Sequence, residues 1–111
     1  MVIRKDLTIY QGGTYEFTMR FKNSNGTAID VSGWTFASQL RTSYVATSTE
    51  AEAAFDMTSA SIGEVTFILT DEDTEAMSAR KGVWDLEYED EDGKVFKIFR
   101  GEYELLLEVT K

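Results

Sequence analysis

The sequence contains no cysteine, no histidine and no proline among its 111 residues. Without cysteine, the chain forms no disulfide and offers no thiolate ligand to a metal. Without histidine, it lacks the commonest general base and the commonest transition-metal ligand. Ser-His-Asp, Cys-His and zinc chemistry are therefore excluded, and we expect a protein that is not an enzyme and carries no cofactor.

Positive charge is also scarce, because 11 Lys and Arg residues face 20 Asp and Glu residues and leave a net charge of −9. Such a chain repels phosphate backbones and anionic bilayers, so we expect neither nucleic acid nor a membrane as a partner. No apolar run approaches the ~20 residues of a membrane span, and no basic and apolar leader follows Met1. The acidity suits solubility, or docking on a basic protein surface.

What the chain does have is enough apolar material for a core, with 42% hydrophobic and 13% aromatic residues. Its length predicts one domain over residues 1–111. Apolar and polar residues alternate in many short segments, clearest in "TYEFTMRFK" (14–22), where Tyr15, Phe17, Met19 and Phe21 share one face. Turn signals such as Asn25-Gly26 separate these segments. The pattern predicts an all-β fold of about seven or eight short strands, an antiparallel β-sandwich or barrel.

Three segments need separate predictions. Residues 43–54 are rich in Ser, Thr and Ala, which favours a long loop or an irregular edge strand. Residues 71–80 are the one helical candidate, two or three turns capped by Thr70, with Met77 and Ala79 among its apolar residues and Gly82 at its end. Near the C-terminus, we expect Gly101 to break the strand that begins at Val95, and a last strand to run on to Val109.

The acidic run from Glu89 to Asp92 is the obvious calcium candidate, with Asp90 and Asp92 as the weak ligand candidates. Calcium requires six to eight oxygen ligands, and consecutive strand residues point to opposite faces. A polar hairpin turn closed by Asp92-Gly93 is the favoured interpretation. A second acidic cluster precedes the helix at Asp71, Glu72, Asp73 and Glu75, where acids offset the helix dipole without any metal.

Two further sets of residues are candidates for binding. The aromatic residues Trp34, Trp84, Tyr88 and Tyr103 could stack on sugars, although their alternation with polar neighbours favours the core. Apolar residues also stand side by side at Ile98-Phe99 and at Leu105 to Leu107. Because adjacent strand residues face opposite ways, we expect Phe99 (or Ile98) and Leu106 to point away from the core, where they are candidates to meet a partner.

The order of these signals resembles a small β-sandwich module of tailed phages. The resemblance is carried by "LTIYQGGTYEF" (7–17), the hairpin at 25–34, the strand at 37–41, the segment 63–87 ending in "WDLE", and the closure at 92–111 ending in "EVTK". These motifs cover most of the chain outside residues 43–60, and they consist of turn and strand chemistry. The module is similar to the N-terminal domain of siphophage upper baseplate proteins and to tail-fibre-associated domains.

This resemblance implies an immunoglobulin-like fold and a structural role in the virion, with no catalytic residues. The expected partners are other virion proteins, with a homo-oligomer as a further possibility, and the expected location is the virion, in the tail rather than the capsid, after synthesis in the host cytoplasm. Three alternatives stay open: a capsid decoration protein, a carbohydrate- or host-surface-binding module, and a calcium-dependent adhesion module.

Overall fold

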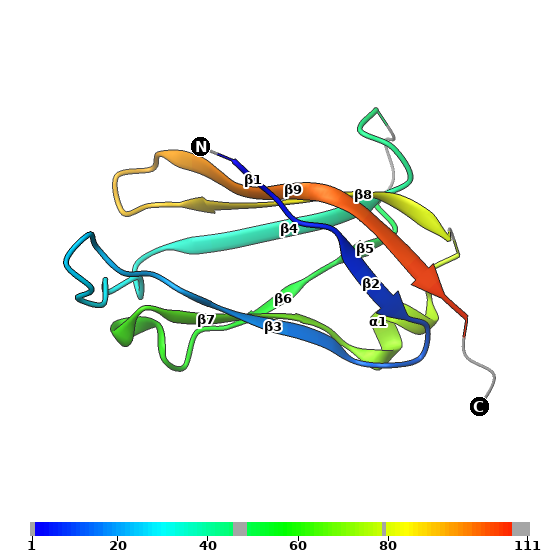
Figure 1. Ribbon diagram of the computed structural model, residues 1–111, viewed down its shortest axis with the longest axis horizontal. Coiled ribbons are helices and arrows are strands. Elements are labelled where there is room, and N and C mark those ends of the chain that lie inside the picture. The colour runs from blue at the N-terminus through cyan, green and yellow to red at the C-terminus, as the bar shows by residue number, and fades with distance from the viewer. Residues whose placement is uncertain (1, 46–48, 79, 108–111) are drawn as a thin grey trace.

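The computed structural model describes residues 2–45, 49–78 and 80–107, so Ala79 and Val109 lie outside the described residues. Two stacked sheets form a sandwich (Figure 1). The larger sheet contains β1 (Ile3–Arg4), β2 (Leu7–Tyr10), β4 (Thr35–Arg41), β5 (Ala51–Glu52), β8 (Lys81–Glu89) and β9 (Val95–Leu106). The smaller sheet contains β3 (Tyr15–Arg20), β6 (Ala54–Asp56) and β7 (Glu64–Leu69). The predicted all-β sandwich is confirmed.

The strand order is β1-β9-β8-β4-β5 in the larger sheet, with β2 also beside β9, and β3-β7-β6 in the smaller one. Most neighbours are antiparallel, but β1 and β2 both run parallel to β9. The predicted antiparallel sandwich therefore holds for most of the strand pairs, with β1 and β2 as the parallel additions. Hairpin connections force antiparallel pairing only between strands that follow each other closely, and here the first strands pair with the last.

The helix is shorter than predicted. A capping box at Thr70 and Asp73 begins α1 at Asp71, but the helix ends at Glu75. Thr74 is fully buried and donates its hydroxyl to the Gly13 carbonyl, and the Met77 N–H bonds to the Thr74 carbonyl, so the chain turns into the core after one turn. Gly82 does not end a helix but lies within β8, where any side chain would overlap the Arg41 carbonyl and the Tyr103 ring. A 3-10 turn at Ala60–Ile62 is the other short helical element.

The sequence predicts that Gly101 breaks the strand that begins at Val95, but the structure has no break there. Instead, β9 continues without interruption over 12 residues. A Cβ atom at Gly101 would overlap the Lys5 carbonyl oxygen, so this glycine lets the segment between β1 and β2 cross close to β9. The Lys5 N–H bonds to the Arg100 carbonyl at 2.9 Å on the same side.

The core lies between the sheets and contains the inward positions of nearly every strand. Trp84 is buried at its centre and donates its indole N–H to the Lys5 carbonyl at 2.7 Å, which fixes the junction of β1 and β2. Tyr15, Phe17, Met19 and Phe21 all pack on the core side, as predicted. Among the described residues, no helix is long and apolar enough to span a bilayer.

Candidate functional site

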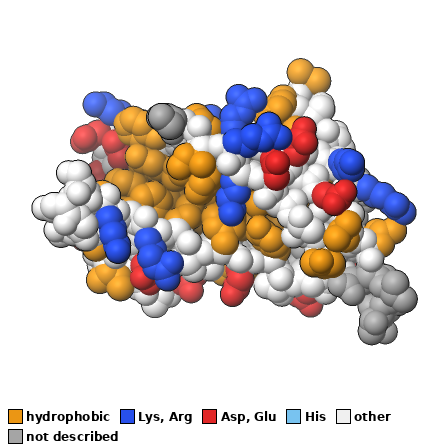
Figure 2. Space-filling view, viewed as in Figure 1, with side chains coloured by type: hydrophobic (Ala, Val, Ile, Leu, Met, Phe, Trp, Pro, Cys, Tyr) orange, Lys and Arg blue, Asp and Glu red, His pale blue; other side chains and the backbone are white. Residues whose placement is uncertain are grey.

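On one side of the sandwich, β1 and β9 lie above β3 in the view of Figure 1. A groove of about 650 Å³ lies there. Figure 2 shows hydrophobic side chains gathered on this face. The groove is lined by residues of the three strands and their ends: Ile3, Arg4, Lys5, Phe17, Thr18, Met19, Arg20, Phe21, Ile98 and Phe99.

The groove exists because the strand above it is too short to cover it. β1 has two residues, after which the Lys5 backbone is held against Trp84 and Arg100. Ile3 of this upper wall remains 52% exposed, and the half-buried side chains of Ile98 and Phe99 line the groove beside it. A contiguous apolar surface with a polar rim is typical of a site that meets a protein or ligand.

A β-bulge changes the expected positions of Ile98 and Phe99. The pairing of β8 with β9 shifts register between Leu86 and Glu87, opposite Phe99 and Lys97, so Ile98 is the extra residue. Both Ile98 and Phe99 are therefore half-buried against the core, and the expectation that one of them points away was wrong. Phe99 packs on Trp84 and Phe17 and still lines the groove.

Leu106 is half-buried at the end of β9, opposite Tyr10 of β2. Its carbonyl accepts the Gln11 N–H at 2.9 Å. Leu106 is not among the residues that line the groove, so the structure does not bring the two interaction candidates, Phe99 and Leu106, onto one surface.

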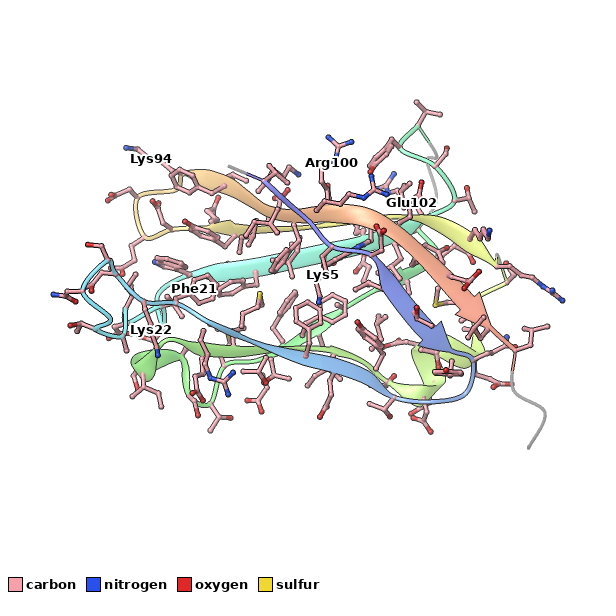
Figure 3. The ribbon with its side chains drawn as sticks, in the orientation of Figure 1. Lys5, Phe21, Lys22, Lys94, Arg100 and Glu102 are labelled. Carbon is pink, nitrogen blue, oxygen red and sulfur yellow. The ribbon has the colours of Figure 1, made fainter. Side chains whose placement is uncertain are left out.

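Arg4, Lys5 and Arg20 line the groove although the chain as a whole is acidic, and Figure 3 shows Lys5 pointing from the upper wall toward β3. The Lys5 ammonium lies 5.0 Å from the centre of the Phe17 ring and so reaches from the upper wall to β3. Arg4 pairs with Asp6 at 3.4 Å and with Glu102 at 3.8 Å. These exposed ion pairs contribute little stability, and they make the rim of the groove polar at this end.

The acidic run is a hairpin turn, as the favoured interpretation predicted. Asp90 accepts the backbone N–H groups of Asp92 and Lys94 on its Oδ1, at 2.9 and 3.0 Å, and the Asp90 N–H bonds to the Lys94 carbonyl. The Asp90 carboxylate is therefore used to hold the turn, while Asp92 is exposed. Gly93 adopts the positive φ of 82° that closes it.

The second acidic cluster lies in the first turn of α1. Asp73 accepts the Thr70 N–H at 3.0 Å and completes the capping box, a structural use of that carboxylate. Asp71, Glu72 and Glu75 are exposed around it. Across the described parts of the chain, no three acidic side chains come together as metal ligands would.

The four aromatic candidates belong to the core rather than to an open platform. Trp84 and Tyr103 are buried, at 1% and 2% exposure. Trp34 and Tyr88 are half-buried and stack on each other, with ring centres 4.2 Å apart and planes within 6°. Because each covers a face of the other, neither ring offers that face to a sugar.

The Tyr103 hydroxyl is buried and has no hydrogen-bond partner in the described part of the chain. Burial, together with the nearby Glu50 carboxylate, raises the pKa of Tyr103 to about 12. Both effects disfavour the phenolate, since a buried anion loses its hydration and a neighbouring negative charge repels it.

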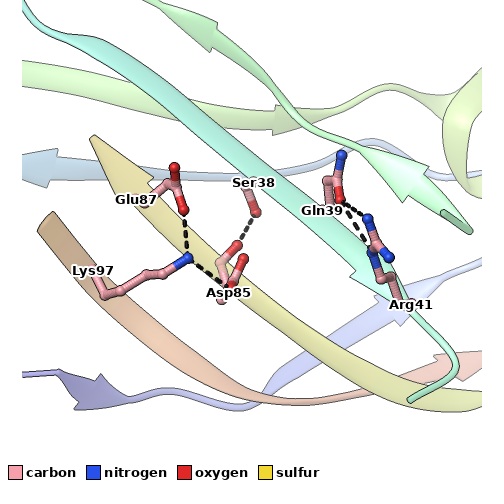
Figure 4. Close-up of polar contacts among 6 residues, drawn as sticks. All are labelled: Ser38, Gln39, Arg41, Asp85, Glu87 and Lys97. Atoms are coloured by element: carbon pink, nitrogen blue, oxygen red, sulfur yellow. Dashed lines mark hydrogen bonds and ion pairs between the residues drawn. The ribbon is translucent and has the colours of Figure 1, made fainter. Parts of the chain in front are cut away.

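The outward face of the larger sheet is polar instead (Figure 4). Lys97 of β9 bonds to Glu87 of β8 and lies 3.3 Å from Asp85 of the same strand. The pKa of Lys97 is raised, and the hydrogen bond with Glu87 is the largest cause. Gln39 accepts from the Arg41 guanidinium beside them. A shallow depression of about 350 Å³ runs over this face. Its side chains largely satisfy one another, so the apolar groove is the stronger site candidate.

Sequence reasoning missed the groove as a whole. Its parts lie far apart in the chain, and the short β1 leaves it open. The available signal was the adjacent apolar pair Ile98-Phe99, both residues of which line the groove.

No known family model matches this chain, and no curated protein is similar to it in sequence. Solved structures do resemble it. A chain from the crystal structure of ICOS in complex with ICOS-L and an anti ICOS-L VNAR domain superposes with a TM-score of 0.55 at 9% identity, over 96% of this chain and 56% of that one. Tim-1 superposes with a TM-score of 0.51 at 9% identity, over 100% of this chain and 99% of its own. These likenesses establish an immunoglobulin-like β-sandwich.

Proposed function

We propose that this chain is a non-enzymatic structural protein of a phage virion, placed in the tail or baseplate or at the attachment of a tail fibre, and that it works by docking on other virion proteins. The observation that carries the docking role is the open apolar groove, which leaves Ile3 exposed at its upper wall beside Ile98 and Phe99. A monomer gains nothing from exposing such a surface, whereas a protein interface buries it.

The phage assignment rests on the resemblance of the sequence motifs to the tailed-phage module. The turn and strand motifs that carry this resemblance build the sandwich: residues 7–17 form β2, a turn and the start of β3, and the closure begins at the hairpin turn that contains Gly93. The ICOS structure is that of a complex with ICOS-L, so a sandwich of this kind is compatible with protein binding.

The location is tested by immunogold electron microscopy on particles of the phage that encodes the chain. We expect label on the tail or at its tip. Label over the head would instead make the protein a capsid decoration protein, and particles without the protein would contradict a virion role altogether.

The docking surface is tested by adding purified protein to particles that lack it. We expect Ile3→Asp to reduce incorporation strongly, because it places a charge in the apolar wall of the groove. Val45→Asp is the matched control, since Val45 is 89% exposed and lies outside the groove. Equal incorporation of both variants would show that docking uses another surface.

A further inference from the structure

The strand that forms the lower wall of the groove has an open edge. β3 ends the smaller sheet and pairs with β7 alone among the described strands. It has six residues, whereas the other edge strands are shorter: two residues in β1 and β5, three in β6 and four in β2. Proteins usually keep open edges short or blunt them, because such an edge is a template for another strand.

The backbone groups that face this opening follow from the register with β7. The Phe21 N–H donates to the Gly63 carbonyl at 2.8 Å, and Phe17 and Met19 stand opposite Phe67 and Val65 in the same register. Antiparallel hydrogen-bonded pairs alternate along a strand, so the odd-numbered residues of β3 bond to β7. The N–H and C=O groups of Glu16, Thr18 and Arg20 therefore point to the open edge.

Nothing in β3 blocks a second strand. The pairing with β7 runs without a bulge from Tyr15 to Arg20, and the chain has no proline. The outward side chains are Glu16, Thr18 and Arg20, so two opposite charges stand at equal distances on either side of Thr18. A single repeated charge would repel a second copy of this strand, but this arrangement complements itself in the antiparallel direction.

We propose that β3 pairs antiparallel with β3 of a second copy of the chain, with the two Thr18 residues opposite each other on a twofold axis. In this register, Glu16 lies opposite Arg20 of the second copy, and Arg20 lies opposite its Glu16. Each of these residues presents both its N–H and its C=O, so the two edges form a continuous ladder of hydrogen bonds. A contact of this kind is isologous, and it closes at two copies.

The inner face of the same pairing is apolar. Phe17 lies opposite Met19 of the second copy, and Tyr15 lies opposite its Phe21, so aromatic and aliphatic side chains meet on the side of the groove. These are the non-hydrogen-bonded positions, where side chains approach most closely. The second copy thereby covers part of the groove that β1 leaves open. Backbone, charges and apolar residues all agree on one register, which favours a second copy of the chain as the partner.

The test is a set of charge reversals examined by light scattering after size exclusion. We expect the wild type to be a dimer. Glu16→Arg and Arg20→Glu each replace two attractive pairs by two repulsive ones, so we expect the dissociation constant of each variant to rise roughly tenfold or more. An equimolar mixture of the two variants restores both attractive pairs, and it should form a one-to-one heterodimer at concentrations where each variant alone is monomeric.

The mixture keeps the test independent of folding, since a misfolded variant would not be rescued by another one. Arg20→Glu also loses its 3.3 Å contact with Glu64, and Glu16→Arg avoids that complication because its neighbour on β7 is Ile68. Glu89→Arg, an equal charge change on an exposed residue of β8, should leave the dimer intact. A wild type that stays monomeric up to roughly 1 mM, a mixture without heterodimer, or a Glu89→Arg effect equal to that of Glu16→Arg would each overturn the pairing.

This inference names one partner of the docking surface and does not depend on the virion role. A protein that is found in particles but never pairs through β3 would overturn the pairing alone. A β3 dimer that is absent from particles would overturn the proposed function alone.

Discussion

Replacing Tyr103 by phenylalanine should protect the protein against alkaline unfolding. The Tyr103 hydroxyl is buried without a hydrogen-bond partner in the described structure, and burial holds its pKa at about 12. A tyrosine in the unfolded chain ionises near pH 10, so the folded state keeps the proton more tightly. The stability due to this group is complete below pH 10 and is lost as the pH rises from there through 12. Each pH unit in that window is worth at most ~1.4 kcal/mol, so about 2–3 kcal/mol of the free energy of unfolding is at stake.

The assay is urea unfolding followed by tryptophan fluorescence, since Trp84 lies in the same core, at pH 7 and at several values between 9 and 12. At pH 7, Tyr103→Phe should be neutral or about 1 kcal/mol more stable, because it removes an unsatisfied buried hydroxyl. Its advantage should then grow with pH. Tyr10→Phe is the matched control, because Tyr10 is 54% exposed. Both variants keep Lys97 and Tyr15, whose pKa values are also raised, so the comparison isolates Tyr103. Identical alkaline profiles for wild type and Tyr103→Phe would refute the reasoning.

Three further outcomes are expected. Gly101→Ala should lower the free energy of unfolding in urea by more than ~2 kcal/mol, because its Cβ would overlap the Lys5 carbonyl. Gly13→Ala should lower it far less, because its Cβ would meet the Tyr10 carbonyl at 3.4 Å. Equal losses in the two variants would contradict the close approach at Gly101. Millimolar calcium should leave the melting temperature unchanged, because the Asp90 carboxylate already serves the turn; a rise of several degrees would restore the turn as a site. Lys97→Met should lower the free energy of unfolding by less than about 1 kcal/mol at pH 7, since half of the Lys97 side chain is exposed, and a larger loss would mean that the polar face is a stabilising network.

The alternation of apolar residues was sufficient to predict the sandwich. The run from Tyr15 to Phe21 places every second side chain in the core, and the structure confirms it because one buried face fixes the register of a strand. The capping box at Thr70 and the turn at Asp90 were also predictable, since both depend on contacts within a few residues.

What failed depends on contacts between distant parts of the chain. The sequence predicts that Gly82 ends a helix and that Gly101 breaks a strand, but tertiary packing makes each a point of close approach inside a long strand. The parallel pairing of β1 and β2 with β9 leaves no local signal. The adjacent apolar residues Ile98 and Phe99 are a signal, but they do not by themselves distinguish a bulge that turns both inward from a strand with one residue on each face. The open groove follows from these features together, so it could not be predicted before the strands were placed.

The claim that β3 pairs with β3 of a second copy is tested most directly by amide hydrogen exchange of residues 14–22 as the protein concentration is raised. The amides of Phe17 and Met19 bond to β7 and should be protected at every concentration. Those of Glu16, Thr18 and Arg20 should exchange rapidly in dilute solution and become protected as copies pair. Rapid exchange of the Thr18 amide at concentrations where the protein is fully dimeric would show that the copies meet elsewhere, and would contradict the account.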